Sequence, residues 1–330
     1  MSNSSVGIIV NPAAGKDIRR LVAQGRFVPN EEKVNIVKRL LIGLEAAGVE
    51  SVVMMPDADM IVHKAVKNIK TCLEVSFLEM SIFYEDLDST KAADLMREQG
   101  VGCIITLGGD GTNRAVAKGS RTVPLIPVST GTNNVFPRMV EGTVAGLAAG
   151  VVARGLVDQD QCLSTTRRLE IYVDDELTDI ALVDVAVSKE WYVGSRAIWD
   201  MTTIHEVFVT GLYPASIGLA AIGARLPSND TNGAEGIHLQ IGEGKLTVKA
   251  PIAPGMIVDV PVQSWRPLKI SDEVEVSHRP CTIALDGERS FTLSDRQQST
   301  VKLTNNGPRV VNIEIALRLA SEAGIFSNKA

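Results

Sequence analysis

The sequence is poor in aromatic residues and has no excess of positive charge. Its 330 residues include 7 Phe, 4 Tyr and 3 Trp, and its 33 basic residues are outnumbered by 39 acidic ones. Proteins that bind DNA or RNA present a basic surface to the phosphates, so we expect no nucleic-acid partner. Because 45% of the residues are hydrophobic and few are aromatic, the core must be aliphatic, as in proteins built around a parallel sheet.

Cysteine and histidine are also scarce, and their spacing fits no metal site. The four cysteines form no C-x-x-C pair, and the four histidines form neither H-E-x-x-H nor His-x-His. We therefore expect reduced cysteines and no zinc. The first five residues carry no basic side chain, which argues against a secretory signal and favours a cytoplasmic protein. The residues concerned are Cys72, Cys103, Cys162, Cys281, His63, His205, His238 and His278.

One uncharged segment raises the question of a membrane span. Residues 207–224 lie between Glu206 and Arg225, and their length is at the lower limit for a spanning helix. The segment also contains Gly211, Pro214 and Gly218, which break helices. We interpret it as a loop followed by a buried helix from about residue 215, and we expect no membrane contact.

The first half of the chain alternates strand and helix patterns. Within 30–47, apolar residues such as Val34, Val37 and Leu41 recur at spacings of three and four, and Gly48 ends the pattern. Strands that alternate with helices predict a Rossmann-like parallel sheet. We expect strands at 6–10, 51–55, 81–84, 102–107 and 123–128, and helices at 30–47, 60–70, 89–99 and 142–153.

Beyond about Arg154, short alternating runs separated by turns replace this pattern. They begin with an expected strand pair at 168–173 and 181–187 and predict an all-β, sandwich-like second domain. Asn312 is a plausible N-cap for a last helix, which we expect to return to the first domain. The expected division is an α/β domain at 1–153, a β-rich domain at 154–308 and a C-terminal helix within 309–330.

The motif Gly108-Gly109-Asp110-Gly111-Thr112 lies between a buried strand and a helix. Glycines at the carboxyl end of a strand allow a tight turn that exposes N–H groups, and the helix N-terminus adds positive partial charge. Ligands of open α/β sheets bind at this edge. The motif therefore predicts a phosphate-binding loop.

Asp110 is unusual within such a loop, because a bare carboxylate repels phosphate. A divalent cation between the two would remove the repulsion, and a substrate hydroxyl could instead give its proton to the carboxylate. Both readings favour phosphoryl transfer, with Asp110 as the candidate catalytic base or Mg²⁺ ligand. The alternative is a glycine-rich turn in which Asp110 caps the next helix.

Two further polar loops follow strands of the same expected sheet. They are Asn-Pro-Ala-Ala-Gly-Lys at 11–16 and Ser-Thr-Gly-Thr-Asn-Asn at 129–134. Each alone could be an ordinary Asx or Ser/Thr turn. Since parallel strands end at one edge of a sheet, we expect a shared nucleotide pocket. The candidate binding residues of these loops are Asn11, Gly15, Thr130, Gly131, Thr132, Asn133 and Asn134.

Two better-known phosphate motifs do not fit. In a dinucleotide-binding G-x-G-x-x-G reading of the glycine motif, Arg114 occupies the place of the third glycine. In a P-loop reading of 10–17, Val10 replaces the first glycine and Asp17 replaces the required Ser or Thr. The sequence therefore favours neither a hydride-transferring Rossmann enzyme nor a P-loop protein.

The three loops, together with Leu-Asp-Gly-Glu at 285–288, occur in the order seen in the NAD kinase and diacylglycerol kinase superfamily. Within it, the chain most resembles the ATP-NAD kinase-like proteins of the acetoin-catabolism X type. The resemblance extends over nearly the whole chain. It implies a kinase that uses ATP and Mg²⁺, with nucleotide phosphates held by Gly108, Gly109, Gly111 and Thr112, and with NAD as the leading acceptor.

The resemblance implies three more site residues. Asp184 lies in Ala-Leu-Val-Asp-Val, which is similar to the Ala-Leu-Asn-Glu-Val of NAD kinases, although Val183 replaces the amide. Asp286 and Glu288 correspond to acidic residues near the superfamily's phosphate site, but Asp286-Gly287 is also an ordinary hairpin-turn sequence. The Tyr-Pro-Ala-Ser-Ile-Gly segment at 213–218 lacks the threonines of the NAD kinase motif in that place.

These departures leave the acceptor open. A kinase of a lipid or another small hydroxyl compound is one alternative, and a nucleotide-binding regulator without efficient turnover is another. The donor could be ATP or polyphosphate. Exposed sheet edges in a β-rich domain make a homo-oligomer a reasonable expectation. We assign no role to Trp191, Trp199, Asp200 or His205, which lie in a segment of unusual composition.

Overall fold

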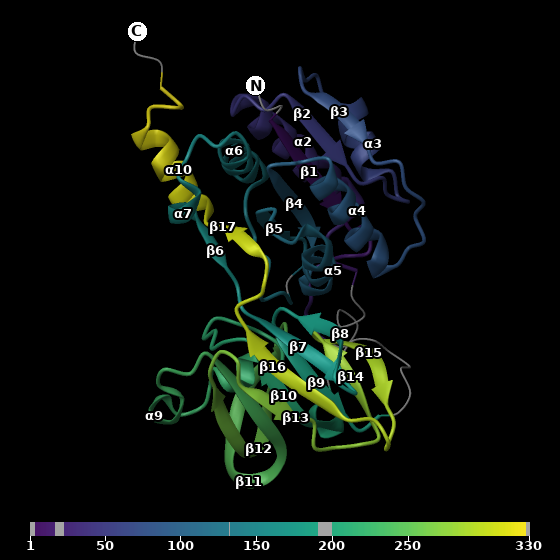
Figure 1. Ribbon diagram of the computed structural model, residues 1–330, viewed down its shortest axis with the longest axis vertical. Coiled ribbons are helices and arrows are strands. Elements are labelled where there is room, and N and C mark those ends of the chain that lie inside the picture. The colour runs from purple at the N-terminus through teal and green to yellow at the C-terminus, as the bar shows by residue number, and fades with distance from the viewer. Residues whose placement is uncertain (1–3, 17–22, 132, 191–199, 328–330) are drawn as a thin grey trace.

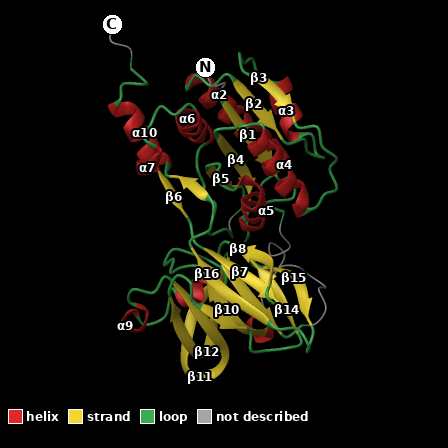
Figure 2. Cartoon of the chain, viewed as in Figure 1, coloured by secondary structure: helices red, strands yellow, loops and turns green. Residues whose placement is uncertain are grey.

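The chain forms an α/β lobe and a β-rich lobe that meet end to end (Figure 1). The computed structural model describes residues 4–16, 23–131, 133–190 and 200–327. Figure 2 shows that all but the shortest helices lie in the upper lobe, whereas the lower lobe consists mainly of strands and loops. The mixed architecture expected from the sequence is therefore confirmed.

The upper lobe is built on a seven-stranded sheet. All its neighbouring pairs are parallel except the last, in which β6 runs antiparallel to β17. In spatial order the strands are β3 (Glu74–Phe77), β2 (Ser51–Met54), β1 (Ser5–Val10), β4 (Cys103–Gly108), β5 (Leu125–Ser129), β17 (Arg309–Val311) and β6 (Leu163–Thr165).

Helices cover both faces of this sheet. Val6 and Ile8 of β1 pack among α2, α3 and α6, whereas Ile9 points to the other face, against α4 and α5. This alternation follows from the two-residue period of a strand. The helices are α2 (Asn30–Ala46), α3 (Ile61–Lys67), α4 (Asp86–Glu98), α5 (Asp110–Ser120), α6 (Gly142–Ala153) and α7 (Gln159–Cys162).

The expected strand at 81–84 is wrong, because the strand of this region is β3, at Glu74–Phe77. Residues 78–85 form a loop instead. The N–H groups of Phe83, Tyr84 and Glu85 donate to the carboxylate of Asp88 rather than to a neighbouring strand.

The lower lobe contains two antiparallel sheets packed face to face, since one core cluster draws on both. The six-stranded sheet is β12 (Met256–Leu268), β11 (Gly236–Ala253), β10 (Ile204–Val209), β9 (Asp184–Ser188), β14 (Cys281–Leu285) and β15 (Glu288–Leu293). The four-stranded sheet is β13 (Glu273–Glu275), β16 (Ser299–Thr304), β7 (Arg168–Val173) and β8 (Glu176–Ala181). Short helical turns are η1 (Met201–Thr203), α8 (Ala220–Gly223) and α9 (Ser228–Thr231).

The expected pairing of 168–173 with 181–187 is also wrong. The partner of β7 is β8, and the chain then crosses to β9 in the other sheet. The crossing occurs at Leu182 and Val183, whose N–H groups donate to Asp286. The helix expected from residue 215 is limited to the single turn α8.

The chain returns to the upper lobe at its C-terminus. Strand β17 joins the seven-stranded sheet beside β5, and α10 (Ile313–Glu322) packs against α6. The side chain of Asn312 accepts a hydrogen bond from the N–H of Ile315, as an N-cap does. Ala316 and Ala320 of α10 are fully buried in the upper core, so the returning helix is confirmed.

Candidate functional site

The glycine motif forms the turn between β4 and α5. Strand β4 ends at Gly108, and α5 begins at Asp110 with Gly109 as its N-cap. A side chain on Gly108 would lie 2.5 Å from the side chain of Thr112, so only glycine fits there. The turn brings the first N–H groups of α5 to the carboxyl edge of the sheet, where they can meet an anion.

Three loops from different strands contact one another at this edge. The Asn11 Nδ2 atom donates to the hydroxyl of Thr112 over 2.8 Å, although the two residues are 101 positions apart. Gly15 has a φ of +76°, and a Cβ atom there would lie 2.3 Å from the Thr130 carbonyl oxygen. A Cβ atom on Gly109 would lie 2.9 Å from the side-chain oxygen of Asn134. The close approach of the loops therefore depends on these glycines.

The loops line a cavity of about 730 Å³. Gly108 and Thr130 do not line it, and Thr132 is outside the described residues. Asp184 lines a small recess that shares Asp110, Asn133 and Asp286 with the cavity. The expected site residues that line the cavity itself are Asn11, Gly15, Gly109, Asp110, Gly111, Thr112, Gly131, Asn133, Asn134, Asp286 and Glu288.

Asp110 is held in place by the loop that follows β5. Its carboxylate accepts the N–H of Phe136 at 2.8 Å and the N–H of Val135 at 3.1 Å. The side chain is almost fully buried but lines the cavity. Asp110 is therefore oriented by the backbone of this loop at the wall of the cavity.

The hairpin between β14 and β15 supplies two acids from the lower lobe. Asp286 and Gly287 form its turn with φ values of 52° and 78°, as the Asp-Gly sequence predicts. Asp286 also lines the cavity: its Oδ1 accepts N–H groups of Leu182 and Val183, while its buried Oδ2 has no hydrogen-bond partner among the described residues. Burial raises the pKa of Asp286 above its usual range.

Asp184 supports this hairpin. Its carboxylate accepts the N–H of Gly287 at 3.2 Å, and its carbonyl accepts the N–H of Asp286. The side chain of Val183 is buried in the lower core, where the resembling NAD kinase segment has an amide. In this chain the segment therefore stabilises the turn that carries Asp286.

Two site features were missed from the sequence. The first is Lys33, a fully buried lysine on α2 whose ammonium donates to the carbonyls of Asn11 and Pro12. Lys33 lies one turn before Val37, on the apolar face of the helix, and this position could have predicted its burial. The second is the extent of the acidic lining, in which five further acids join the expected Asp110, Asp286 and Glu288 and only two basic residues accompany them. Together they are Asp57, Asp59, Glu85, Asp86, Asp88, Asp110, Asp286 and Glu288 with Lys16 and Arg26.

The two lobes are joined beside the cavity. A guanidinium nitrogen of Arg114 donates to the carbonyl oxygen of Leu285 over 2.9 Å, and a second one lies 3.5 Å from Asp86. Gln24 donates its N–H to the carbonyl of Pro254, at the tip of the β11–β12 hairpin. The cavity is thus walled by both lobes.

Two family models match the chain. One is described as the ATP-NAD kinase N-terminal domain and covers residues 6–156, and the other as the acetoin catabolism protein X C-terminal domain and covers residues 167–306. The chain is therefore a kinase-like protein whose upper lobe corresponds to the ATP-NAD kinase N-terminal domain.

A curated relative extends this result to the full length. Acetoin catabolism protein X of Cupriavidus necator is 37% identical over 329 residues, which cover 96% of this chain and 92% of the relative. The chain belongs to the acetoin catabolism protein X family, as its motifs predict. Among solved structures, a provisionally assigned diacylglycerol kinase from Bacillus anthracis str. Sterne aligns with a TM-score of 0.43 at 16% identity, over 93% of this chain and 98% of that chain.

Across the described parts of the chain, no helix is both long and apolar enough to cross a membrane. The uncharged segment at 207–224 contributes the end of β10, a loop and α8.

Proposed function

We propose that this protein transfers the γ-phosphoryl group of ATP to a hydroxyl acceptor, with NAD as the leading acceptor. One observation carries the proposal: three polar loops and the Asp286 hairpin surround one cavity, and Asp110 lies among them. In this assignment the phosphates lie against the residues of the glycine motif and of the loops at 11–16 and 129–134. In this proposal the acceptor binds to the β-rich domain expected at 154–308, between the nucleotide-binding domain expected at 1–153 and the C-terminal helix within 309–330.

The acidic lining fits a magnesium nucleotide better than a bare one. The described residues contain no group of three or more Asp, Glu, His or Cys side chains placed to hold a metal ion by themselves. Mg²⁺ needs no such cage, because it binds through one or two carboxylates together with substrate phosphates and water. Asp110 and the unpaired Oδ2 of Asp286 are suitable oxygen donors. Magnesium would neutralise phosphate charge in the transition state.

Asp110 has the chemistry of a general base in this site. The acceptor oxygen would form a bond to the γ-phosphorus as the bond to the bridging β–γ oxygen breaks, and ADP would leave. The proton of the acceptor hydroxyl would pass to the carboxylate of Asp110, whose orientation is fixed by Val135 and Phe136. Glu288, at the hairpin, would orient the acceptor.

A coupled assay tests the proposal with purified protein, Mg-ATP and NAD. We expect NADP formation that falls by roughly 10²- to 10⁴-fold in Asp110→Asn, the usual loss on removing a general base. Asp94→Asn is the matched control, since Asp94 pairs with Arg97 on α4 away from the cavity. If the protein transfers phosphate to glycerol, to a lipid or to another hydroxyl compound but not to NAD, the kinase activity stands and NAD is rejected as the acceptor. A loss of less than about threefold in Asp110→Asn would reject its role as base.

A nucleotide-binding regulator is the second candidate function. It is favoured by the packing of Val183 in the lower core, in place of the amide, and by the support that Asp184 gives to the Asp286 turn. Tight ATP binding without turnover on any acceptor would support this candidate over the kinase. We further propose a cytoplasmic homo-oligomer, which equilibrium sedimentation can test.

A further inference from the structure

The loop between β3 and α4 is shaped by one buried carboxylate. Asp88 is 5% exposed, and it accepts N–H groups from Phe83 at 3.0 Å, Tyr84 at 2.8 Å and Glu85 at 3.3 Å. The Glu85 side chain in turn accepts the N–H of Asp88, which completes a capping box at the start of α4. The backbone of this loop is therefore fixed, although the loop lies at the outer edge of the upper lobe (Figure 1).

The fixed loop holds Tyr84 at the surface. Tyr84 has a φ of 66°, a left-handed conformation that bulky residues rarely adopt. Its side chain is 81% exposed, and yet it lines the cavity. A backbone outlier that presents an aromatic ring at the mouth of a site points to a function for that ring.

The part of the cavity near Tyr84 differs from the phosphate loops. Met55 and Ile82 line it together with Tyr84 and provide apolar surface. The adjacent carboxylates of Glu85 and Asp86 also line the cavity and would repel phosphate groups. Their oxygens can instead accept hydrogen bonds from hydroxyl or amino groups. This corner suits an uncharged ring that carries such donors.

We propose that Tyr84 is a stacking platform for the nucleobase of a nucleotide bound in the cavity. The inference rests on the proposed function and adds a base subsite to it. Two ligands could supply a ring of this kind: the adenine of the ATP donor, or an aromatic ring of a dinucleotide acceptor. Aromatic side chains bind bases through their faces and need no particular base sequence or hydrogen-bond pattern.

A docking surface for another protein is the competing explanation. Phe83 and Leu87 flank Tyr84 and are 71% and 67% exposed. Neither residue lines the cavity. Phe83→Ala is therefore a matched control, because it removes a neighbouring aromatic ring of similar exposure that does not line the cavity.

The test measures binding to the full-length protein by calorimetry, with Mg-ATP, NAD and Mg-tripolyphosphate as separate ligands. We expect Tyr84→Ala to weaken binding of ATP, of NAD or of both by roughly 5- to 150-fold, the usual range for a base stacked on an aromatic ring. Tripolyphosphate has no base, so its affinity should change by less than about twofold. Tyr84→Phe should restore binding, and Phe83→Ala should leave it unchanged.

The outcomes separate the subsite from the proposed function. If the unmodified protein binds neither ATP nor tripolyphosphate, the proposed function fails and the subsite fails with it. If both bind but Tyr84→Ala weakens neither nucleotide, or weakens tripolyphosphate equally, only the base subsite is rejected. A change of oligomeric state in both Tyr84→Ala and Phe83→Ala, with unchanged nucleotide binding, would assign the loop to protein docking.

Discussion

The ammonium nitrogen of Lys33 lies 2.7 Å from the carbonyl oxygen of Pro12 and 3.1 Å from that of Asn11. The lysine thereby supports the first polar loop from behind, at a position that solvent does not reach. Burial and the nearby charge of Lys16 lower the pKa of Lys33 to about 8, although Asp59 and Asp57 oppose the shift. The loop is thus tied to a charged group that is costly to bury.

Lys33 should make the stability of the protein depend on alkaline pH. Its folded pKa of about 8 is below the ordinary 10.5, so the unfolded chain binds more protons between these values. The free energy of unfolding should therefore rise over this interval, by at most about 3 kcal/mol. Urea unfolding at pH 7 to 10.5 should show this rise in the unmodified protein but not in Lys33→Met. Parallel pH profiles for the two proteins would contradict the prediction.

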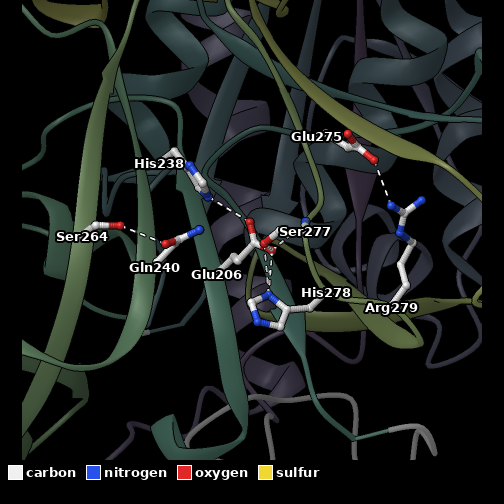
Figure 3. A network of polar contacts seen from close by, with 8 residues as sticks. All are labelled: Glu206, His238, Gln240, Ser264, Glu275, Ser277, His278 and Arg279. Carbon is white, nitrogen blue, oxygen red and sulfur yellow. Dashed lines mark hydrogen bonds and ion pairs between the residues drawn. The ribbon is translucent and has the colours of Figure 1, made fainter.

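A second buried charge, that of Glu206, lies in the lower lobe and does not line the cavity. Figure 3 shows its carboxylate together with His238, Ser277 and His278. Glu206 is fully buried, and its carboxylate lies 2.9 Å from His238 Nε2 and 3.1 Å from His278 Nδ1. It also accepts the N–H and the hydroxyl of Ser277. Burial by itself would raise the pKa of Glu206, but these hydrogen bonds outweigh it and lower the pKa to about 2.

Glu206 should contribute to acid denaturation. Because its folded pKa is below the ordinary 4.5, its stabilisation is complete above about pH 4.5 and is lost as the pH falls towards 2. We expect Glu206→Gln to lower the free energy of unfolding at pH 7 by about 2–3 kcal/mol and to flatten its dependence on acid pH. In contrast, Glu275→Gln, which removes an exposed partner of Arg279, should cost less than about 1 kcal/mol. If the two substitutions lowered the free energy of unfolding equally, the proposed stabilisation by the hydrogen bonds of Glu206 would be wrong.

Arg114 should couple the two lobes. Its replacement by Met keeps the apolar stem but leaves the buried carbonyl of Leu285 without its donor, at a cost of about 1–3 kcal/mol. Since Arg114 also opposes the upward pKa shift of Asp286, that pKa should rise further. Arg318→Met, which removes an exposed ion pair with Glu322 on α10, is the control and should cost less than about 1 kcal/mol. Thermal unfolding of both variants gives the comparison, and equal stability would reject the coupling.

Local sequence patterns were sufficient to predict most strands and helices of the upper lobe and to identify its polar loops. Strands β1, β2, β4 and β5 and the helices between them lie close to the expected ranges, because long apolar periodicities record which face is buried. The strand at 81–84 was wrong for a specific reason. Its run of Ile82, Phe83 and Tyr84 resembles a strand in residue type, but Asp88 accepts the N–H groups that a strand would need.

Asp286 shows how local and tertiary information combine. Asp-Gly between two apolar runs predicts a hairpin turn, and the turn is present. That the same side chain lines the cavity depends on the docking of the two lobes through Arg114 and Leu285. The hairpin sequence alone therefore cannot predict that Asp286 lines the cavity.

The sequence by itself determined the family, the alternation of strands and helices in the first half of the chain and the three glycine-containing loops, because turns and periodic burial depend on neighbouring residues. Only the tertiary structure decided that Lys33 supports the Asn11 loop, that Tyr84 lines the cavity, and that Asp184 holds the Asp286 turn. The physical reason is that buried polar groups must find hydrogen-bond partners wherever the fold brings them, and those partners can be far away in the chain.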